Sequence, residues 1–199
     1  YQTTSEIVDL TVKGRNKCNN WPDFPIGVQG ATGGLIGDTV IICGGYGGAF
    51  VDECYSLTSE KVTLVTHTSV GRYGVASIVI NDNTLWVTGG KGGWNNGAFL
   101  ASTDYVTVTG TMPGPDLPMA LERHAMVAIN RTCSIVIGGY NDIMIHNNTF
   151  ASTFYYDHSE GEWINGPSLM QARSYHAAGI VTDEVTGEHF VAVTGGFSS

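Results

Sequence analysis

The residues best suited to bind a ligand fall in two recurring loop positions of this chain. One set precedes apolar segments and comprises Arg72, Tyr73, Arg123, His124, Arg173, Tyr175 and His176. The other follows pairs of glycines and comprises Tyr46, Lys91, Trp94, Tyr140 and Asn141. Arginine forks match carboxylates, and aromatic rings provide contact area. The pattern predicts a site for a protein, an acidic peptide or an anionic sugar, with turn formation and packing as the alternative roles of these residues.

Catalytic motifs are not evident in the sequence. It contains no GxSxG or GxxxxGK motif, and residues 89–93 are interpreted as a glycine-rich loop. His124 and His176 occupy equivalent positions in their repeats. We assign Tyr73 and Gly30 to the same position in the other two repeats. Zinc or copper needs three or four ligands, and no HxH or CxxC spacing supplies the rest. We therefore expect histidines bonded to backbone groups, and neither a metal, a cofactor nor an enzyme activity.

The four cysteines offer one plausible cross-strand pair. Cys43 ends an apolar segment, and Cys54 lies in the segment expected to run back beside it. A bridge would contribute about 2–3 kcal/mol in the chain-entropy model, and the alternative is two small buried thiols. Cys18 and Cys133 lie in different repeats and have no predicted partner. An even number of cysteines suits an oxidising compartment.

Two glycosylation sequons also favour a secreted, extracellular chain. They begin at Asn130 and Asn147, and both fall in expected loops, where an acceptor must be exposed. The sequence begins at Tyr1 without a basic-then-apolar leader, so we expect a processed chain or a piece of a longer one.

Composition limits the remaining classes. The 199 residues suit one domain, and 27 glycines with few charged residues favour an all-β, turn-rich chain. The net charge of -9, with no basic run, gives no general attraction for nucleic acid. No apolar run approaches the roughly 18–20 residues of a membrane span.

A repeat of about 50 residues organises these positions. Double glycines close the apolar runs TVIICGG, TLWVTGG, SIVIGG and FVAVTGG, which we predict to be strands buried on both faces. A second apolar strand precedes the last three runs across a polar hairpin, and tyrosine-containing segments follow the first three. Outer strands are weakly indicated at 61–65 and 112–118 and more clearly at 162–164.

The order of these features resembles the kelch repeat. The segment from Arg173 to Ala178, the run FVAVTGG, and the sequence from a double glycine through Tyr155, Tyr156 and Asp157 to Trp163 carry the resemblance. It implies an all-β propeller of four-stranded blades that binds partners through its loop rim. The expected units are 1–27 (outer strands of a split blade), 28–70, 71–120, 121–170 (blades) and 171–199 (inner strands of a split blade).

Two aspects of this resemblance stay open. The termini could close a four-bladed ring, but kelch propellers usually have six or seven blades. We therefore favour a fragment of a larger ring, or a ring completed by other chains or by a homo-oligomer. For function, the resemblance favours a non-catalytic binding or scaffold protein. The alternatives are a lectin-like or matrix glycoprotein, and a relative of the copper enzyme galactose oxidase, whose ligand set does not map onto this sequence.

Overall fold

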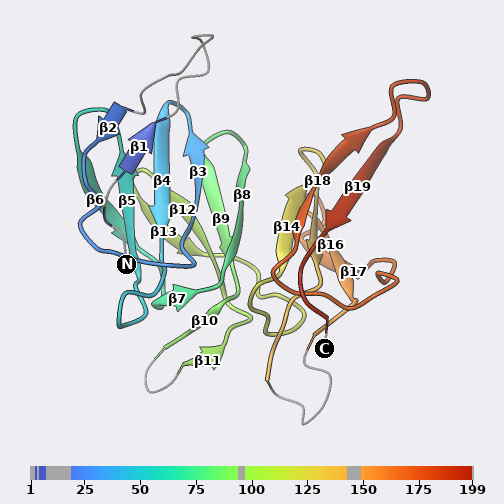
Figure 1. The fold of residues 1–199 in the computed structure, drawn as a ribbon. Coiled ribbons are helices and arrows are strands. Elements are labelled where there is room, and N and C mark those ends of the chain that lie inside the picture. Colours follow the sequence, from blue (N-terminus) through green and yellow to red (C-terminus); the bar gives the residue numbers. More distant parts are fainter. Residues whose placement is uncertain (1–2, 4, 8–18, 94–96, 143–148, 199) are drawn as a thin grey trace.

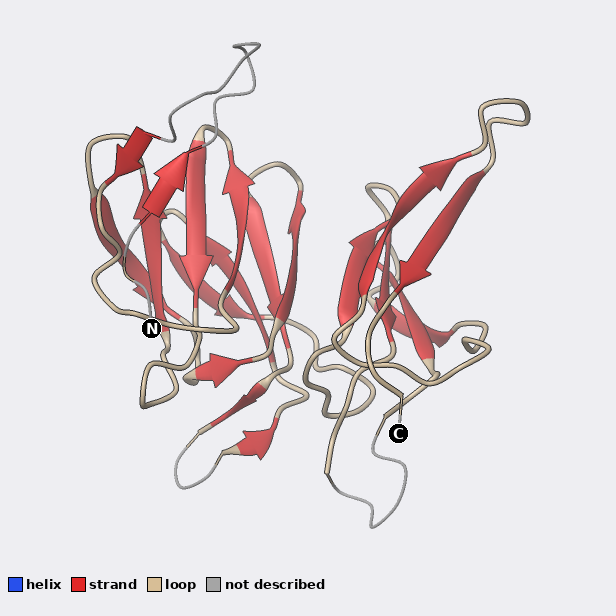
Figure 2. Ribbon diagram, in the orientation of Figure 1, coloured by secondary structure: helices blue, strands red, loops and turns tan. Residues whose placement is uncertain are grey.

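The computed structural model describes residues 3, 5–7, 19–93, 97–142 and 149–198. These residues form nineteen β-strands and no helix (Figure 2), so the described chain contains no helix able to cross a membrane. The predictions for Cys18, Trp94 and Asn147 concern residues outside the described ranges. The predicted all-β fold is confirmed.

Three four-stranded antiparallel sheets form the body of the chain, and we call them blades 1 to 3. Blade 1 contains β3 (Thr32–Ile36), β4 (Thr39–Cys43), β5 (Glu53–Leu57) and β6 (Val62–His67). Blade 2 contains β8 (Ala76–Ile80), β9 (Thr84–Thr88), β12 (Thr103–Thr107) and β13 (Gly110–Pro113). Blade 3 contains β14 (Ala125–Ala128), β15 (Cys133–Ile137), β16 (Thr153–Asp157) and β17 (Glu162–Asn165). The weakly indicated outer strands of the first two repeats therefore form as β6 and β13.

Two smaller sheets lie at the ends of this array. β1 (Ser5–Ile7) pairs with β2 (Asn19–Trp21), and β18 (Ala177–Thr182) pairs with β19 (His189–Thr194). The two pairs are separate sheets in the described chain, so the termini do not share one blade (Figure 1). The innermost strands β3, β8, β14 and β18 adjoin in that order, as expected for an arc of a propeller.

Apolar side chains fill the spaces between neighbouring blades. Ile41 of blade 1 packs in one buried cluster with Leu85 and Val106 of blade 2. Trp86 of blade 2 packs in a second cluster with Val136 and Tyr156 of blade 3. Because β9 and β15 contribute to clusters on both faces, their sequences are continuous apolar runs rather than alternating ones.

The double glycines connect each blade to the next. The second glycine of the pair donates its N–H across the junction in three repeats: Gly45 to the Arg72 carbonyl at 2.8 Å, Gly90 to Leu121 at 2.7 Å and Gly139 to Arg173 at 2.9 Å. A Cβ at Gly90 would lie 2.8 Å from the Tyr73 carbonyl oxygen, and its φ of 97° also disfavours other residues. Glycine is therefore required where the blades approach most closely.

Three short strands form a small sheet at the loop end of blade 2. β7 (Arg72–Tyr73), β10 (Lys91–Gly92) and β11 (Ala98–Phe99) form a three-stranded sheet in the order β11-β10-β7. Isolated bridges occupy the same place in the other repeats, joining Tyr46 to Gln29, Tyr140 to Glu122 and Phe197 to Ser174. This pairing sets the true alignment of the rim residues between repeats.

Candidate binding site

The rim is built on one repeated backbone position in the left-handed region. Gly30, Gly74, Arg123 and Tyr175 follow the bridged residues and have φ angles of 64°, 66°, 55° and 57°. Each N–H donates to the carbonyl of the preceding member: Gly74 to Gly30 at 3.1 Å, Arg123 to Gly74 at 2.7 Å and Tyr175 to Arg123 at 3.0 Å. These successive hydrogen bonds place the four residues in one arc along the rim.

The arc corrects our alignment of the histidines and arginines. His124 and His176 are equivalent, but their position belongs to Ala31 and Val75 in the first two repeats, and not to Gly30 and Tyr73. Arg72 and Arg173 are likewise equivalent, whereas Arg123 lies two positions later. The three arginines therefore have different surroundings, although each occurs once in its repeat.

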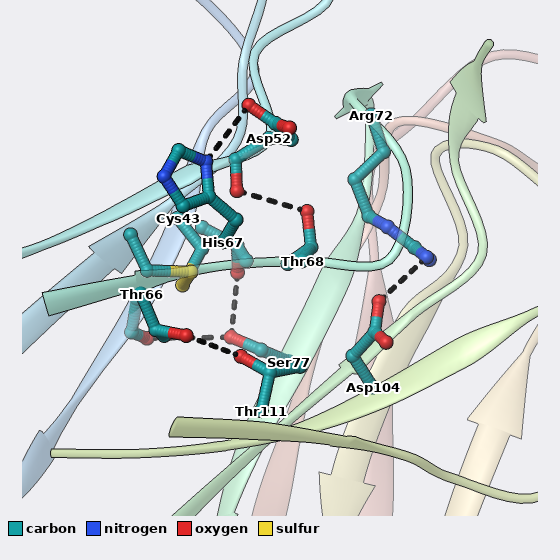
Figure 3. Close-up of a disulfide and its surroundings, with 12 residues drawn as sticks. Cys43, Asp52, Thr66, His67, Thr68, Arg72, Ser77, Asp104 and Thr111 are labelled. Atoms are coloured by element: carbon teal, nitrogen blue, oxygen red, sulfur yellow. Dashed lines mark hydrogen bonds and ion pairs between the residues drawn. A yellow bond between two sulfur atoms is a disulfide. The ribbon is translucent and has the colours of Figure 1, made fainter. Parts of the chain in front are cut away.

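Arg72 lies in the interior of blade 2. Its side chain is fully buried, and Nη2 lies 2.7 Å from Asp104 Oδ2 (Figure 3). Its Nη1 donates to the carbonyls of Gly89 at 3.1 Å and Ser102 at 2.8 Å. Burial lowers the pKa of Arg72, and the Asp104 carboxylate opposes that effect. Arg72 thus links three segments of its own blade and does not reach the rim surface.

Arg123 lies at the rim between two tyrosine rings. Its guanidinium carbon is 4.6 Å from the ring centre of Tyr73 and 3.8 Å from that of Tyr175. Its Nε donates to Glu122 Oε1 at 3.2 Å. Within the described chain, its two Nη atoms make no hydrogen bond, and 18% of the side chain is exposed. The outer edge of the guanidinium is therefore held in place and open to a ligand.

Glu122 holds the guanidinium of Arg123 through a hydrogen bond from Nε. Its side chain is only 7% exposed, and among the described residues its Oε2 has no hydrogen-bond partner. Burial raises the pKa of Glu122, while the Lys91 ammonium opposes the increase. The carboxylate thus fixes the Nε edge of Arg123 and leaves the Nη edge available.

An open pocket of about 880 Å³ adjoins Arg123 across the Tyr73 ring. Tyr46, Phe50 and Tyr73 line it, with ring centres 5.4 Å apart for Tyr46 and Phe50 and 6.2 Å apart for Tyr46 and Tyr73. Lys91 and Asp52 contribute opposite charges to the lining. Because Tyr73 borders both the pocket and Arg123, the two belong to one continuous surface.

The two equivalent histidines lie behind the rim. His124 is buried, and its Nε2 is 2.8 Å from the Thr88 hydroxyl. Burial, and to a lesser extent His176, lower the pKa of His124 to about 3. His176 stands opposite Ile137, the residue equivalent to Thr88. Burial and then Arg173 lower the pKa of His176, whereas a backbone contact with Ile137 opposes them. No described side chain forms a hydrogen bond with either ring nitrogen. The expectation that backbone groups satisfy these rings is wrong for His124, whose partner is a hydroxyl.

The other predicted rim residues are dispersed. Arg173 is partly exposed and donates from Nη1 to the Gly195 carbonyl at 2.8 Å. Tyr140 packs against Phe99, with ring centres 5.7 Å apart, and Lys91 lies over the same Phe99 ring at 5.1 Å. Asn141 is buried and donates to the Ala120 carbonyl at 2.8 Å.

Sequence reasoning missed three contributors to the rim. Phe197 is 70% exposed and packs edge-to-face on Tyr175, with ring centres 5.5 Å apart. Phe50 lines the pocket, and Glu122 holds Arg123. Phe197 follows a double glycine, as Tyr46, Lys91 and Tyr140 do, so the repeat pattern contained the signal for it. Glu122 had no such signal because the alignment of the rim was shifted.

The predicted cross-strand disulfide is confirmed. Cys43 and Cys54 are bonded, at paired positions of β4 and β5 in the core of blade 1 (Figure 3). Nearby, His67 Nδ1 lies 3.3 Å from Asp52 Oδ1 at the pocket edge. Cys133 is unpaired with any described residue. A disulfide suits an oxidising location.

Two further features concern modification and metal binding. Asn130 is exposed in the turn between β14 and β15, where a sequon acceptor is expected. Within the described ranges, no three His, Cys, Asp or Glu side chains gather in a group that could hold a metal ion.

Comparisons with known proteins support a kelch-repeat fold. A model of the kelch motif matches residues 123–170. A solved structure titled "Structure of YjhT", a kelch-type propeller, superposes with a TM-score of 0.74 at 16% sequence identity, covering 89% of this chain and 64% of that one. The chain thus spans less than two thirds of that structure's length, and no curated protein matches it in sequence. A kelch propeller supports a binding or scaffold role in general. Together these observations show a kelch motif at residues 123–170 within a kelch-type propeller fold.

Proposed function

We propose that this chain is an extracellular binding module whose rim takes an acidic protein or peptide ligand. The observation that carries the proposal is the Arg123 guanidinium, which is stacked between Tyr73 and Tyr175 and presents its Nη edge outward. A carboxylate accepts two hydrogen bonds from such an edge, and prior fixing of the arginine reduces the side-chain entropy lost on binding.

The backbone at this position supports a functional role. Gly30 and Gly74 adopt the left-handed conformation without a side chain, whereas Arg123 and Tyr175 adopt it with one. Such a conformation costs a non-glycine residue on the order of 1–2 kcal/mol, and strain of this kind concentrates at ligand-binding sites. The two strained residues are also the two whose side chains stack on each other.

The neighbouring pocket supplies the contact area that a single ion pair lacks. Its tyrosine and phenylalanine rings suit the apolar portions of a peptide, and Lys91, whose charge also acts on Glu122, adds a second cation to the lining. Glu122, the carboxylate nearest to Arg123, has one oxygen already engaged by that residue. The accessible edge of this surface therefore favours an anion.

Peptide display tests the acidic-ligand proposal. A random peptide library is selected on the native chain and on Arg123→Glu, and the affinities of the selected peptides are measured. We expect the native chain to enrich Asp- and Glu-containing peptides, and Arg123→Glu to bind them about 10- to 100-fold more weakly, since a buried charge contact contributes about 1–3 kcal/mol.

Arg131→Glu is the matched control. Arg131 is exposed in the β14–β15 turn, remote from the rim, and its reversal changes net charge equally. Circular dichroism verifies that both variants fold. Equal loss of binding in the two variants, or enrichment of neutral peptides by the native chain, would contradict the proposal.

A lectin-like or matrix glycoprotein role is the second candidate. It is favoured by the three aromatic rings that line the pocket, because sugar C–H faces stack on such rings. In a glycan array, a sugar ligand would require Tyr46 and Tyr73 and would be retained by the Arg123→Glu chain. Peptide binding without glycan binding would favour the first candidate.

Location outside the cell rests on two features. The Cys43–Cys54 disulfide suits an oxidising environment, and the exposed Asn130 is accessible to a glycosyltransferase.

A further inference from the structure

The kinds of group that hold Arg123 recur in the neighbouring pocket without a cation between them. Arg123 is stacked between Tyr73 and Tyr175 and is bonded to the Glu122 carboxylate. The pocket of about 880 Å³ is lined by three aromatic rings and by the Asp52 carboxylate, and the Tyr73 ring borders both sites. Rings and a carboxylate together are the environment in which this chain already holds a guanidinium.

The second repeat carries a cation at the equivalent ring. Lys91 pairs with Phe99, and its ammonium lies 5.1 Å from the centre of that ring. Tyr46 forms the corresponding bridge to Phe50 in the first repeat, so the two phenylalanines are equivalent. Among the described residues, no Lys or Arg side chain lies over the ring of Tyr46 or of Phe50. The rings of the first repeat are therefore open to a cation that a ligand supplies.

Asp52 is held at the blade 1 side of the pocket with part of its carboxylate accessible. Its carbonyl accepts from the Thr68 N–H at 2.7 Å and from the Thr68 hydroxyl at 3.1 Å, which fixes the backbone (Figure 3). His67 Nδ1 lies 3.3 Å from Asp52 Oδ1, and 50% of the Asp52 side chain is exposed. The second carboxylate oxygen, Oδ2, makes no hydrogen bond or ion pair within the described chain and is available to a donor.

The two sides of the pocket carry opposite charges. The Lys91 ammonium lies over Phe99 and acts electrostatically on Glu122, which places it on the side of Arg123. Asp52 directly precedes β5 on the blade 1 side. A ligand that covers both sides therefore matches the surface best when it carries a carboxylate near Arg123 and a cation near Asp52.

We propose that this pocket binds a guanidinium, supplied by an arginine of the same peptide whose carboxylate binds Arg123. The guanidinium stacks on the rings of Tyr46, Phe50 and Tyr73, and its N–H edge donates to Asp52. A planar guanidinium can stack on a ring and donate to a carboxylate at the same time, whereas an ammonium has no flat face. The source of the guanidinium rests on the proposed peptide-binding function, but the guanidinium site itself does not.

Two small probes of matched shape test the pocket directly. N-butylguanidinium chloride carries the charge, and N-butylurea is its neutral planar counterpart. Each probe is titrated into the ¹³C-labelled chain, and the ring signals of Tyr46, Phe50 and Tyr73 are followed by NMR. We expect butylguanidinium to shift these signals and to bind at least about fivefold more tightly than butylurea, because the rings and the carboxylate both favour the cation.

Asp52→Asn removes the charge of the pocket carboxylate and keeps its shape. We expect it to weaken butylguanidinium binding about threefold or more and to leave butylurea binding unchanged. Asp38→Asn is the matched control, because Asp38 is exposed in the turn before β4, whereas the pocket lies beyond the end of that strand. Phe50→Leu keeps an apolar wall and removes a ring, so it should also weaken butylguanidinium binding.

Circular dichroism verifies that these variants fold. Equal binding of the two probes to the native chain would overturn the guanidinium site. Equal loss of butylguanidinium binding in Asp52→Asn and Asp38→Asn would overturn it as well.

The peptide library tests the source of the guanidinium. Peptides enriched by the native chain should contain an arginine at a fixed spacing from the Asp or Glu. Selection on Asp52→Asn should keep the acidic residue and lose the arginine, whereas selection on Arg123→Glu should do the reverse. Acidic peptides without arginine would overturn the proposed source. Arginine-containing peptides without an acidic residue, together with tight butylguanidinium binding, would contradict the proposed function and leave the guanidinium site standing.

Discussion

The second and fourth repeats begin with an arginine at the same position, yet they place it in different surroundings. Arg72 and Arg173 each donate from Nη1 to the carbonyl of the first glycine of their own repeat, at 3.1 Å and 2.8 Å. Arg72 is fully buried and paired with Asp104. Arg173 is partly exposed and has no acidic partner among the described residues. The backbone contact is common to both, whereas the ion pair is not.

The difference shows what the third strand contributes to a blade. Asp104 lies on β12, which pairs with β9 and carries the carboxylate under the guanidinium. The β18–β19 sheet has no described third strand and thus no equivalent of Asp104. A buried arginine is tolerated where a counter-charge is positioned beside it, and otherwise the charge stays near solvent.

Breaking the pair in the second repeat should have the largest effect. Asp104→Ala leaves the Arg72 charge buried without its counter-ion, and such changes typically cost about 3–5 kcal/mol. Arg173→Ala removes a partly exposed contact and should cost about 1 kcal/mol or less. Urea unfolding measures both free energies of unfolding.

Arg72→Met in the Asp104→Ala background provides the control, because replacing both charges with apolar atoms should restore part of the stability. Equal losses for Asp104→Ala and Arg173→Ala would show that burial does not distinguish the two repeats.

Buried His124 should make the stability of the chain depend on pH. The pKa of His124 is about 3 in the folded chain and near 6.5 in the unfolded one. As the pH falls below about 6.5, the unfolded chain takes up the proton first, so the free energy of unfolding falls between pH 6.5 and pH 3 and is fully retained above that range.

Thermal melts at pH 7.5 and pH 5 measure this effect. We expect His124→Gln to reduce the loss of melting temperature on acidification, because glutamine does not titrate. His189→Gln changes an exposed histidine and controls for the His→Gln substitution itself. A native-like acid sensitivity in His124→Gln would assign the effect to other groups.

The repeat made most of the fold predictable from sequence. Double glycines marked the ends of β4, β9, β15 and β19, and the tyrosine-containing segments became β5, β12 and β16. Burial on both faces was predicted correctly for β9 and β15, since a neighbouring blade covers each side. It was wrong for β19, because an apolar run indicates what a strand is suited to contact and not whether that neighbour is present.

The rim was less predictable because its alignment depends on short bridges. Spacing alone placed Arg123 with Arg72, whereas the pairing of Glu122 with Tyr140 moves it to the position of Gly74. The burial of Arg72 depends on Asp104, a residue 32 positions away in the sequence. Contacts of this kind follow from which strands pair, and no local motif encodes them.

The last comparison concerns the hydroxyl that distinguishes the two histidine sites. The Thr88 hydroxyl lies 2.8 Å from His124 Nε2 and 3.2 Å from the Ala76 carbonyl, so it accepts from the ring and donates to the backbone. Thr88→Val keeps the shape and removes both contacts. We expect it to cost about 1–3 kcal/mol, since a buried ring N–H loses its acceptor.

Ile137→Thr makes the reverse change opposite His176, whose ring nitrogens have no side-chain hydrogen-bond partner in the described chain. The gained hydrogen bond and the lost apolar contact are each worth about 1 kcal/mol, so the net change should stay within about 1 kcal/mol of zero. The informative measurement is the ¹⁵N chemical shift of the His176 ring, which should move towards the values of His124. If that shift stays unchanged while Thr88→Val alters the His124 ring, the two histidines differ in the backbone around them and not only in the residue that they face.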